Sequence, residues 1–289
     1  MICNICPRKC NKERSEKEGF GYCGVGTNPI VARAALHFFE EPCLSSTNGS
    51  GTIFFSSCNL RCEFCQNHEI SFDKKGELIT KEKLVELMKK LEQEGANNIN
   101  FVTPTHYSFL IRDALDLYKP SIPIIYNTSG YELVEEIKKL DGYVDIFLPD
   151  LKYYSREYSL MLSNADNYFT YASKAIEQMI KQVGVPVFEN GIMKKGVIIR
   201  HLVLPRLSED SIEILKYIKE NYPPYVYVSI MSQYTPLKKY NHDFLNRRIT
   251  KREYDKVVDY ALSLKLDNIY IQELESASSV YVPDFYDKL

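Results

Sequence analysis

The sequence predicts an α/β protein, an open partial (β/α)6 barrel of the TIM type that follows a Cys-rich N-terminal extension. From residue 51 onward, short apolar runs alternate with longer amphipathic stretches. The apolar runs are almost continuous, as in parallel strands that are buried on both faces. The alternating units are too few to close an eight-unit barrel. We therefore assign residues 1–50 to the extension and residues 51–289 to the barrel.

The predicted elements follow from periodicity and end signals. The strands are expected at residues 51–57, 98–103, 122–128, 144–149, 197–204 and 225–232, with a candidate seventh at 268–273. The helices are expected at residues 80–94, 107–118, 131–140, 164–183, 208–221 and 250–264. The helix at 80–94 has the clearest signal, because Thr80 is a suitable N-cap and Leu84, Leu87, Met88 and Leu91 form one apolar stripe.

Composition narrows the class of protein. The chain has 289 residues, of which 45% are hydrophobic and 26% are charged, as in a soluble globular protein. A net charge of −2 offers no electrostatic footprint for nucleic acid. The sequence has no apolar run long enough to cross a membrane and no signal peptide at its start. We expect a cytoplasmic protein with neither a nucleic acid nor a membrane as partner.

Three cysteines directly follow the first predicted barrel strand. Cys58, Cys62 and Cys65 have the spacing C-x3-C-x2-C on one short loop. Soft thiolate ligands are suited to iron in an iron–sulfur cluster. A [4Fe–4S] cluster held by three cysteines leaves one iron open for a ligand that is not protein. The loop is therefore a candidate cluster site.

A second group of cysteines lies in the extension. Cys3, Cys6, Cys10 and Cys23 have the spacing C-x2-C-x3-C-x12-C, and glycines surround the last of them. Four thiols suit a closed structural site. Either a zinc ion or a second Fe–S cluster is consistent with this pattern, and free thiols of an N-terminal arm are the alternative.

Polar side chains follow the predicted strands, where a barrel of parallel strands gathers its functional groups. These residues include Thr103, Thr105 and His106 after the second strand, Asn127 and Ser129 after the third, Asp150 and Lys152 at the fourth, Arg200 and His201 on the fifth, and Gln233 after the sixth. In the extension, His37, Glu40 and Glu41 either line a site or belong to a solvated hairpin.

The cysteine loop, with Phe64 before its third cysteine, resembles the signature loop of the radical S-adenosylmethionine (radical SAM) superfamily. The resemblance implies that SAM chelates the open iron through its amino and carboxylate groups. Reductive cleavage of SAM then produces a 5′-deoxyadenosyl radical that abstracts hydrogen from a substrate. An open partial barrel and a low-potential electron donor of the flavodoxin or ferredoxin class are also implied.

A narrower resemblance is to pyruvate formate-lyase activating enzyme and its homologues. It is carried by Asp150-Leu151-Lys152, by the stretch 127–131 and by Arg200 in the stretch 199–205. The N-terminal Cys-x2-Cys-Pro-Arg-x-Cys resembles that of an uncharacterised branch of these homologues. This implies that Asp150, Lys152 and Arg200 help to bind SAM, that Phe64 lies near its adenine, and that the partner is a glycyl radical enzyme.

The sequence departs from that family after the second strand. Thr103-Pro104-Thr105-His106 replaces Gly-Gly-Glu-Pro, so Thr103 or Thr105 is a candidate partner of the SAM ammonium, and His106 is a candidate contact of SAM or substrate. Asn127 replaces an acidic residue linked to a monovalent cation. A radical SAM enzyme acting on a small molecule or peptide is the alternative function, and a non-catalytic zinc or iron–sulfur protein is an alternative from another class.

Overall fold

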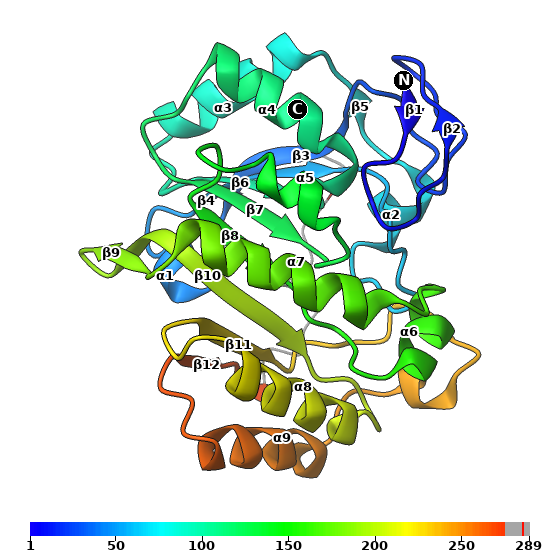
Figure 1. The fold of residues 1–289 in the computed structure, drawn as a ribbon, viewed down its shortest axis with the longest axis vertical. Helices are drawn as coiled ribbons and strands as arrows, with labels where there is room; N and C mark the ends of the chain where they lie inside the picture. The colour runs from blue at the N-terminus through cyan, green and yellow to red at the C-terminus, as the bar shows by residue number, and fades with distance from the viewer. Residues whose placement is uncertain (275–284, 286–289) are drawn as a thin grey trace.

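The computed structural model describes residues 1–274 and residue 285, which form a mixed α/β fold around one large sheet (Figure 1). In this part of the chain the sheet has ten strands in the order β12-β11-β10-β8-β7-β6-β4-β3-β5, with β9 paired to β10. Its strands are β3 (Ile30–His37), β4 (Ser50–Phe55), β5 (Glu77–Leu78), β6 (Ile99–Val102), β7 (Ile124–Thr128), β8 (Ile146–Pro149), β9 (Val187–Glu189), β10 (Ile192–Leu202), β11 (Tyr227–Met231) and β12 (Ile269–Ile271).

The strands from β4 to β12, apart from β5 and β9, pair in parallel and follow one another across the sheet in chain order. All residues of β4, β6, β7 and β8 are buried, which explains the continuous apolar sequences of these four strands. The candidate seventh strand forms as β12, parallel to β11. The prediction of an α/β protein with a parallel sheet is confirmed, and the carboxyl ends of these strands meet at one edge.

Helices and short 3₁₀ turns connect the strands. They are α1 (Pro42–Ser45), α2 (His68–Asp73), α3 (Lys81–Gln93), η1 (Thr105–Tyr107), α4 (Ser108–Leu117), α5 (Val134–Lys138), α6 (Arg156–Ser163), α7 (Tyr168–Val183), α8 (Ser208–Asn221), η2 (Asp243–Asn246) and α9 (Lys251–Ser263). Thr80 is the N-cap of α3, as predicted. No described helix is long and apolar enough to cross a membrane.

The N-terminal segment contributes to two sheets. β1 (Ile2–Cys3) and β2 (Lys12–Glu13) form a small antiparallel pair of their own. β3 instead pairs antiparallel with β4 at one side of the large sheet. Part of the segment that we assigned to the extension is therefore continuous with the sheet that carries the cysteine loop.

Several short elements were absent from the sequence prediction, among them α2, α6 and β9. Helix α6 begins after Ser155, whose side chain accepts a hydrogen bond from the Glu157 amide. The short strand β9 pairs antiparallel with the start of β10. In addition, α5 is shorter than expected. The Tyr131 carbonyl, inside the predicted helix, accepts a hydrogen bond from the Asn59 side chain, and the helix begins only at Val134.

Candidate active site

The three predicted cluster ligands lie on the loop that leaves the carboxyl end of β4. Cys58 and Cys62 are buried and Cys65 is half-buried. Ser57 and Arg61 have positive φ angles of 70° and 53°, so the backbone turns sharply on either side of Cys58. These turns bring all three cysteines to the wall of one cavity.

The protein surroundings disfavour free thiolates in this loop. Burial raises the pKa of Cys58 and of Cys65, that of Cys65 to about 12, and the neighbouring Cys62 raises both further. Metal ligation requires the thiolate form. A bound cationic centre would therefore supply the charge compensation that water does not provide here.

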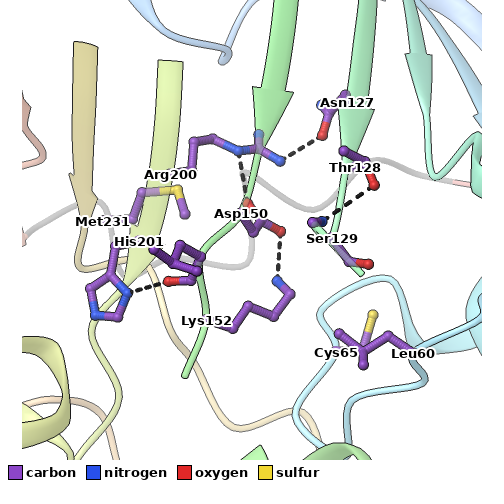
Figure 2. Close-up of polar contacts among 12 residues, drawn as sticks. Leu60, Cys65, Asn127, Thr128, Ser129, Asp150, Lys152, Arg200, His201 and Met231 are labelled. Carbon is purple, nitrogen blue, oxygen red and sulfur yellow. Dashed lines mark hydrogen bonds and ion pairs between the residues drawn. The ribbon is translucent and has the colours of Figure 1, made fainter. Parts of the chain in front are cut away.

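Asp150 links two cations beside the cysteine loop, as Figure 2 shows. Its carboxylate accepts from Lys152 Nζ at 2.6 Å and from Arg200 Nε at 3.0 Å. Burial by itself would raise the pKa of Asp150, but Lys152 and Arg200 outweigh it and hold this pKa below its usual value. Asp150 likewise outweighs burial and raises the pKa of Lys152. The triad is therefore ionised at neutral pH.

Arg200 extends this network to the far side of the cavity. Its guanidinium donates to Asn127 Oδ1 at 2.6 Å and to Glu40 Oε2 at 3.3 Å. Glu40 also accepts from Asn100 Nδ2 at 3.0 Å. Glu40 thus belongs to the site and not to a solvated hairpin, the interpretation that the sequence had left open.

The cavity has a volume of about 410 Å³, within the range of clefts that hold small molecules. It brings together most of the predicted site residues. Those in its wall are Cys58, Cys62, Phe64, Cys65, Thr103, Asn127, Ser129, Asp150, Lys152, Arg200 and Gln233. The Ser129 hydroxyl has no hydrogen-bond partner among the described residues, so it is available to a ligand.

Thr105 and His106 lie behind the wall instead of lining it. Thr105 donates to Glu132 Oε1 at 2.6 Å. The His106 ring bonds through Nε2 to the Ser56 carbonyl at 2.9 Å, and burial lowers the pKa of His106 to about 3. In this structure these two side chains support the wall, and Thr103 is the residue of its stretch that faces the cavity.

The backbone is strained at two positions of this wall. Thr103 is β-branched but has a φ of 59°, and its amide donates to the Asn127 carbonyl at 2.9 Å. Gly130 has a φ of 77°, and a Cβ there would lie 2.3 Å from the Asp150 carbonyl oxygen. Glycine at position 130 thus lets the loop after β7 approach the Asp150 backbone.

Tyr168 is a site residue that the sequence analysis missed. This buried residue begins α7, and its hydroxyl donates toward the carbonyls of Ser129 and Asp150, at 2.8 and 2.9 Å. It also accepts from the Lys152 amide at 3.0 Å. An aromatic residue in an amphipathic helix has the sequence signature of the core, so no local signal could identify this role.

The N-terminal segment that carries four cysteines contacts the cysteine loop through Cys23 and Arg8. Cys3, Cys6 and Cys23 are buried and Cys10 is half-buried. The carbonyl of Cys23 accepts from Ser57 Oγ at 2.6 Å and from Arg61 at 3.2 Å. Arg8 donates to the carbonyls of Asn59 and Ser163, at 2.9 and 2.8 Å. The extension is thereby joined directly to the loop that holds Cys58 and Cys62.

The cavity fits a cluster with a bound small molecule better than a single ion. Within residues 1–274 and 285, no three His, Cys, Asp or Glu side chains are gathered closely enough for one metal ion. A cluster distributes its cysteines over separate iron atoms. The thiol loop, the ionised Asp150 triad and the unpartnered Ser129 hydroxyl share one cavity, so fold and site define a protein that holds a cofactor at the carboxyl edge of a parallel sheet.

Comparison with known proteins identifies the family. Residues 52–218 match the family model described as the Radical SAM superfamily, and the chain belongs to this superfamily. A relative from Methanocaldococcus jannaschii, an uncharacterized protein, is 32% identical over 280 residues, which cover 93% of this chain and 76% of the relative. Membership implies an enzyme that uses a [4Fe–4S] cluster and SAM.

Solved structures agree with this fold. Streptococcus suis SuiB bound to S-adenosylmethionine has a TM-score of 0.51 at 14% identity, over 76% of this chain and 50% of SuiB. SuiB bound to the precursor peptide SuiA has a TM-score of 0.50 at 16% identity, over 76% of this chain and 48% of that one. This chain therefore spans about half the length of these SuiB chains. At these identities the likeness concerns the fold alone.

Proposed function

We propose that the protein reductively cleaves SAM and uses the resulting 5′-deoxyadenosyl radical to abstract hydrogen from a substrate. One observation carries the proposal: the Cys58, Cys62 and Cys65 thiols share a cavity with the ionised network of Asp150, Lys152 and Arg200. The cluster, when bound, supplies the low-potential electron. The chain's own residues bind and orient SAM and exclude water from it.

The residues divide this work by their chemistry. Lys152 and Arg200 carry the positive charge that a SAM carboxylate requires, and Asp150 keeps both side chains in place. Ser129 has a free hydroxyl for the ligand. Phe64 offers an apolar face for adenine, and Gln233 and Thr103 complete the polar wall. Asn127 orients Arg200 through its amide oxygen.

The finer assignments are also proposals. We interpret the chain-order parallel sheet as an open partial barrel with an open flank for substrate or partner. The activating-enzyme-like motifs support an oxidoreductase that receives its electron from a flavodoxin or ferredoxin and acts on a glycyl radical enzyme. The eight free cysteines suit a reducing, cytoplasmic setting. Modification of a small molecule or peptide is the second candidate, favoured by the acidic end of the cavity described below.

We also propose that Cys3, Cys6, Cys10 and Cys23 hold a second metal centre, either zinc or an Fe–S cluster. Gly21 leaves room for Cys10, because a Cβ at Gly21 would lie 3.3 Å from Cys10 Sγ. The Tyr22 amide donates to the same sulfur at 3.2 Å. Cys3 and Cys23 both lie near Arg14, which reaches Cys3 Sγ at 3.9 Å and the Val25 carbonyl at 3.1 Å. These contacts support the proposal, because Arg14 joins Cys3 to the backbone near Cys23, and the Tyr22 amide joins Cys10 to the same stretch.

The function is tested by reconstituting the protein anaerobically with iron and sulfide, adding SAM and dithionite, and measuring 5′-deoxyadenosine and methionine. Wild type should form both products. Cys62→Ala should form neither, and Asp150→Asn should weaken SAM binding by about tenfold or more, since it removes a buried charged partner of two cations.

Cys43→Ala is the matched control, because it removes a cysteine that belongs to neither group and should retain cleavage. Absence of 5′-deoxyadenosine from reconstituted wild type would contradict the proposal and restore the non-catalytic alternative.

A further inference from the structure

The cavity has an acidic end opposite its thiol end. Glu40 and Glu41 follow β3 and precede α1, which lies near the start of β10 in Figure 1, whereas the cysteine loop follows the end of β4. Leu44 of α1 packs in one apolar cluster with Ile125 and Ile198 from the inner strands. This packing fixes α1 against the sheet, so the two glutamates approach the cavity from the side where the strands begin.

The two glutamates differ in their partners. Glu40 is held by Arg200 at 3.3 Å and by the side chains of Asn100 and Asn127, at 3.0 and 3.4 Å. Glu41 is only 8% exposed and receives a side-chain hydrogen bond from Ser229, yet its Oε2 has no hydrogen-bond partner among the described residues. Asn100 Oδ1, next to Glu40, also lacks one within this part of the chain. Both unpartnered atoms are acceptors, and a buried acceptor without a donor is costly.

If every titratable group of the cavity wall were ionised, the wall would carry an excess of one negative charge, and burial accordingly raises the pKa of Glu40 and of Glu41. Among its described residues are three carboxylates, Glu40, Glu41 and Asp150, and two cations, Lys152 and Arg200, so that 2 − 3 = −1. His37 does not compensate, because burial and the nearby Arg33 and Arg200 lower its pKa and keep it neutral. A buried charge without a counter-charge is unfavourable. A proton or a ligand cation must therefore balance the acidic end.

We propose that the acidic end binds a primary ammonium group of the substrate, with Glu41 as its principal acceptor. This inference rests on the proposed function and specifies the substrate class. An ammonium supplies both missing features, a positive charge and N–H donors for unpartnered acceptors. A glycyl backbone is neutral and offers no such group. The acidic end therefore favours an amine-bearing small molecule or a lysine-containing peptide over a glycyl radical loop.

The test compares two probes of nearly equal shape, n-butylammonium and 1-butanol, by calorimetry on the oxidised, cluster-loaded, SAM-bound protein. Wild type should bind n-butylammonium at least about tenfold more tightly than 1-butanol. Glu41→Gln should remove this preference. Glu136→Gln should keep it, because Glu136 is also 8% exposed but pairs with Lys139 outside the cavity.

Four results would overturn the inference. The first is equal binding of the two probes by wild type, and the second is an unchanged preference for n-butylammonium in Glu41→Gln. The third is a loss of SAM affinity in Glu41→Gln that is as large as its loss of amine binding. The fourth is displacement of n-butylammonium from wild type when potassium chloride replaces sodium chloride. The third would assign Glu41 to the ammonium of SAM, and the fourth would make the site one for an inorganic cation. The wild-type comparison decides the matter even where the variant does not fold.

The binding test requires no electron transfer, so its outcome is separate from SAM cleavage. Normal 5′-deoxyadenosine formation without an ammonium preference overturns only this inference. An ammonium preference without SAM cleavage overturns only the proposed function.

Discussion

Glu132 is a buried carboxylate that accepts three hydroxyl hydrogen bonds through a single oxygen. Thr128, Thr105 and Tyr126 lie 2.5, 2.6 and 3.3 Å from its Oε1. Burial raises the pKa of Glu132 to about 7, although the three hydroxyls oppose the shift. Thr128 lines the cavity. The protonation of Glu132 therefore affects the wall of the site from behind.

Glu132 should make the stability of the protein fall as the pH rises. Its folded pKa of about 7 lies above the ordinary glutamate value of 4.5, so the folded state binds the proton more tightly than the unfolded state does. Between about pH 5 and pH 8, wild type should lose on the order of 3 kcal/mol of unfolding free energy relative to Glu132→Gln. Guanidinium unfolding at several pH values measures this difference.

The control for this prediction is Glu157→Gln, which makes the same chemical change at an exposed position. Parallel pH profiles for wild type and Glu132→Gln would show that Glu132 ionises normally in the fold.

At the scale of elements, Glu253 connects three segments at the start of α9. Thr250 and Glu253 form a capping box, and Arg247 donates two hydrogen bonds of 2.7 Å to the same carboxylate. The Arg206 amide, in the loop after β10, donates to it at 2.9 Å. Helix α9 is thus attached by hydrogen bonds to the loop that follows β10. Its apolar face also packs against the rest of the protein.

Thr250→Ala should lower the free energy of unfolding by about 1 kcal/mol, because it removes the N-cap acceptor of the Glu253 amide and the hydroxyl that donates to the Glu253 side chain. Denaturant unfolding of the two proteins gives the value. Thr47→Ala in an exposed loop makes the same side-chain change without a cap. A loss no greater than that of Thr47→Ala would mean that the box adds nothing to the packing of α9.

For the whole molecule, the N-terminal cysteines and the Cys58 loop lie on two segments that contact each other without sharing a ligand. The side chains of Ser57 and Arg61 in the Cys58 loop donate hydrogen bonds to the Cys23 carbonyl. Arg8 stacks on Tyr22 at 3.9 Å and contacts the loop from the other side. These contacts join the segments but share no thiol, so we expect the proposed N-terminal centre to be separate from the cluster of the Cys58 loop.

Cys62→Ala should therefore remove the iron of the SAM cluster and leave the N-terminal centre loaded, whereas Cys10→Ser should do the reverse. Metal and sulfide analysis of anaerobic protein measures both. In wild type, about four irons with zinc would indicate one cluster and a structural zinc, and about eight irons would indicate two clusters. Equal metal loss from both centres in either variant would argue against separate sites.

Much of the site was predictable from the sequence, because the residues that follow parallel strands all lie at the carboxyl edge of the sheet. Cys58, Asp150 and Lys152 come directly after or at the end of strands with clear apolar sequences, so their meeting follows from the α/β pattern. Arg200 is within a strand and could be placed only through the family resemblance. Glu40 and Glu41 belong to a segment outside the repeating units, and nothing in their local sequence determines which side of the sheet α1 covers.

By itself, the sequence determined the fold class and the kind of cofactor site. The periodicity of apolar residues specifies an α/β fold, and the spacing of Cys58, Cys62 and Cys65 specifies a cluster loop. Both signals depend on residues that are close together in the chain. Only the tertiary structure decided which groups share the cavity. It placed His106 behind the cavity wall and brought the Tyr168 hydroxyl to the Asp150 carbonyl. It also placed Glu41 at the acidic end of the cavity. These outcomes depend on packing between segments that are distant in the sequence. The burial and charge of each residue are set there by spatial neighbours that the local sequence does not predict.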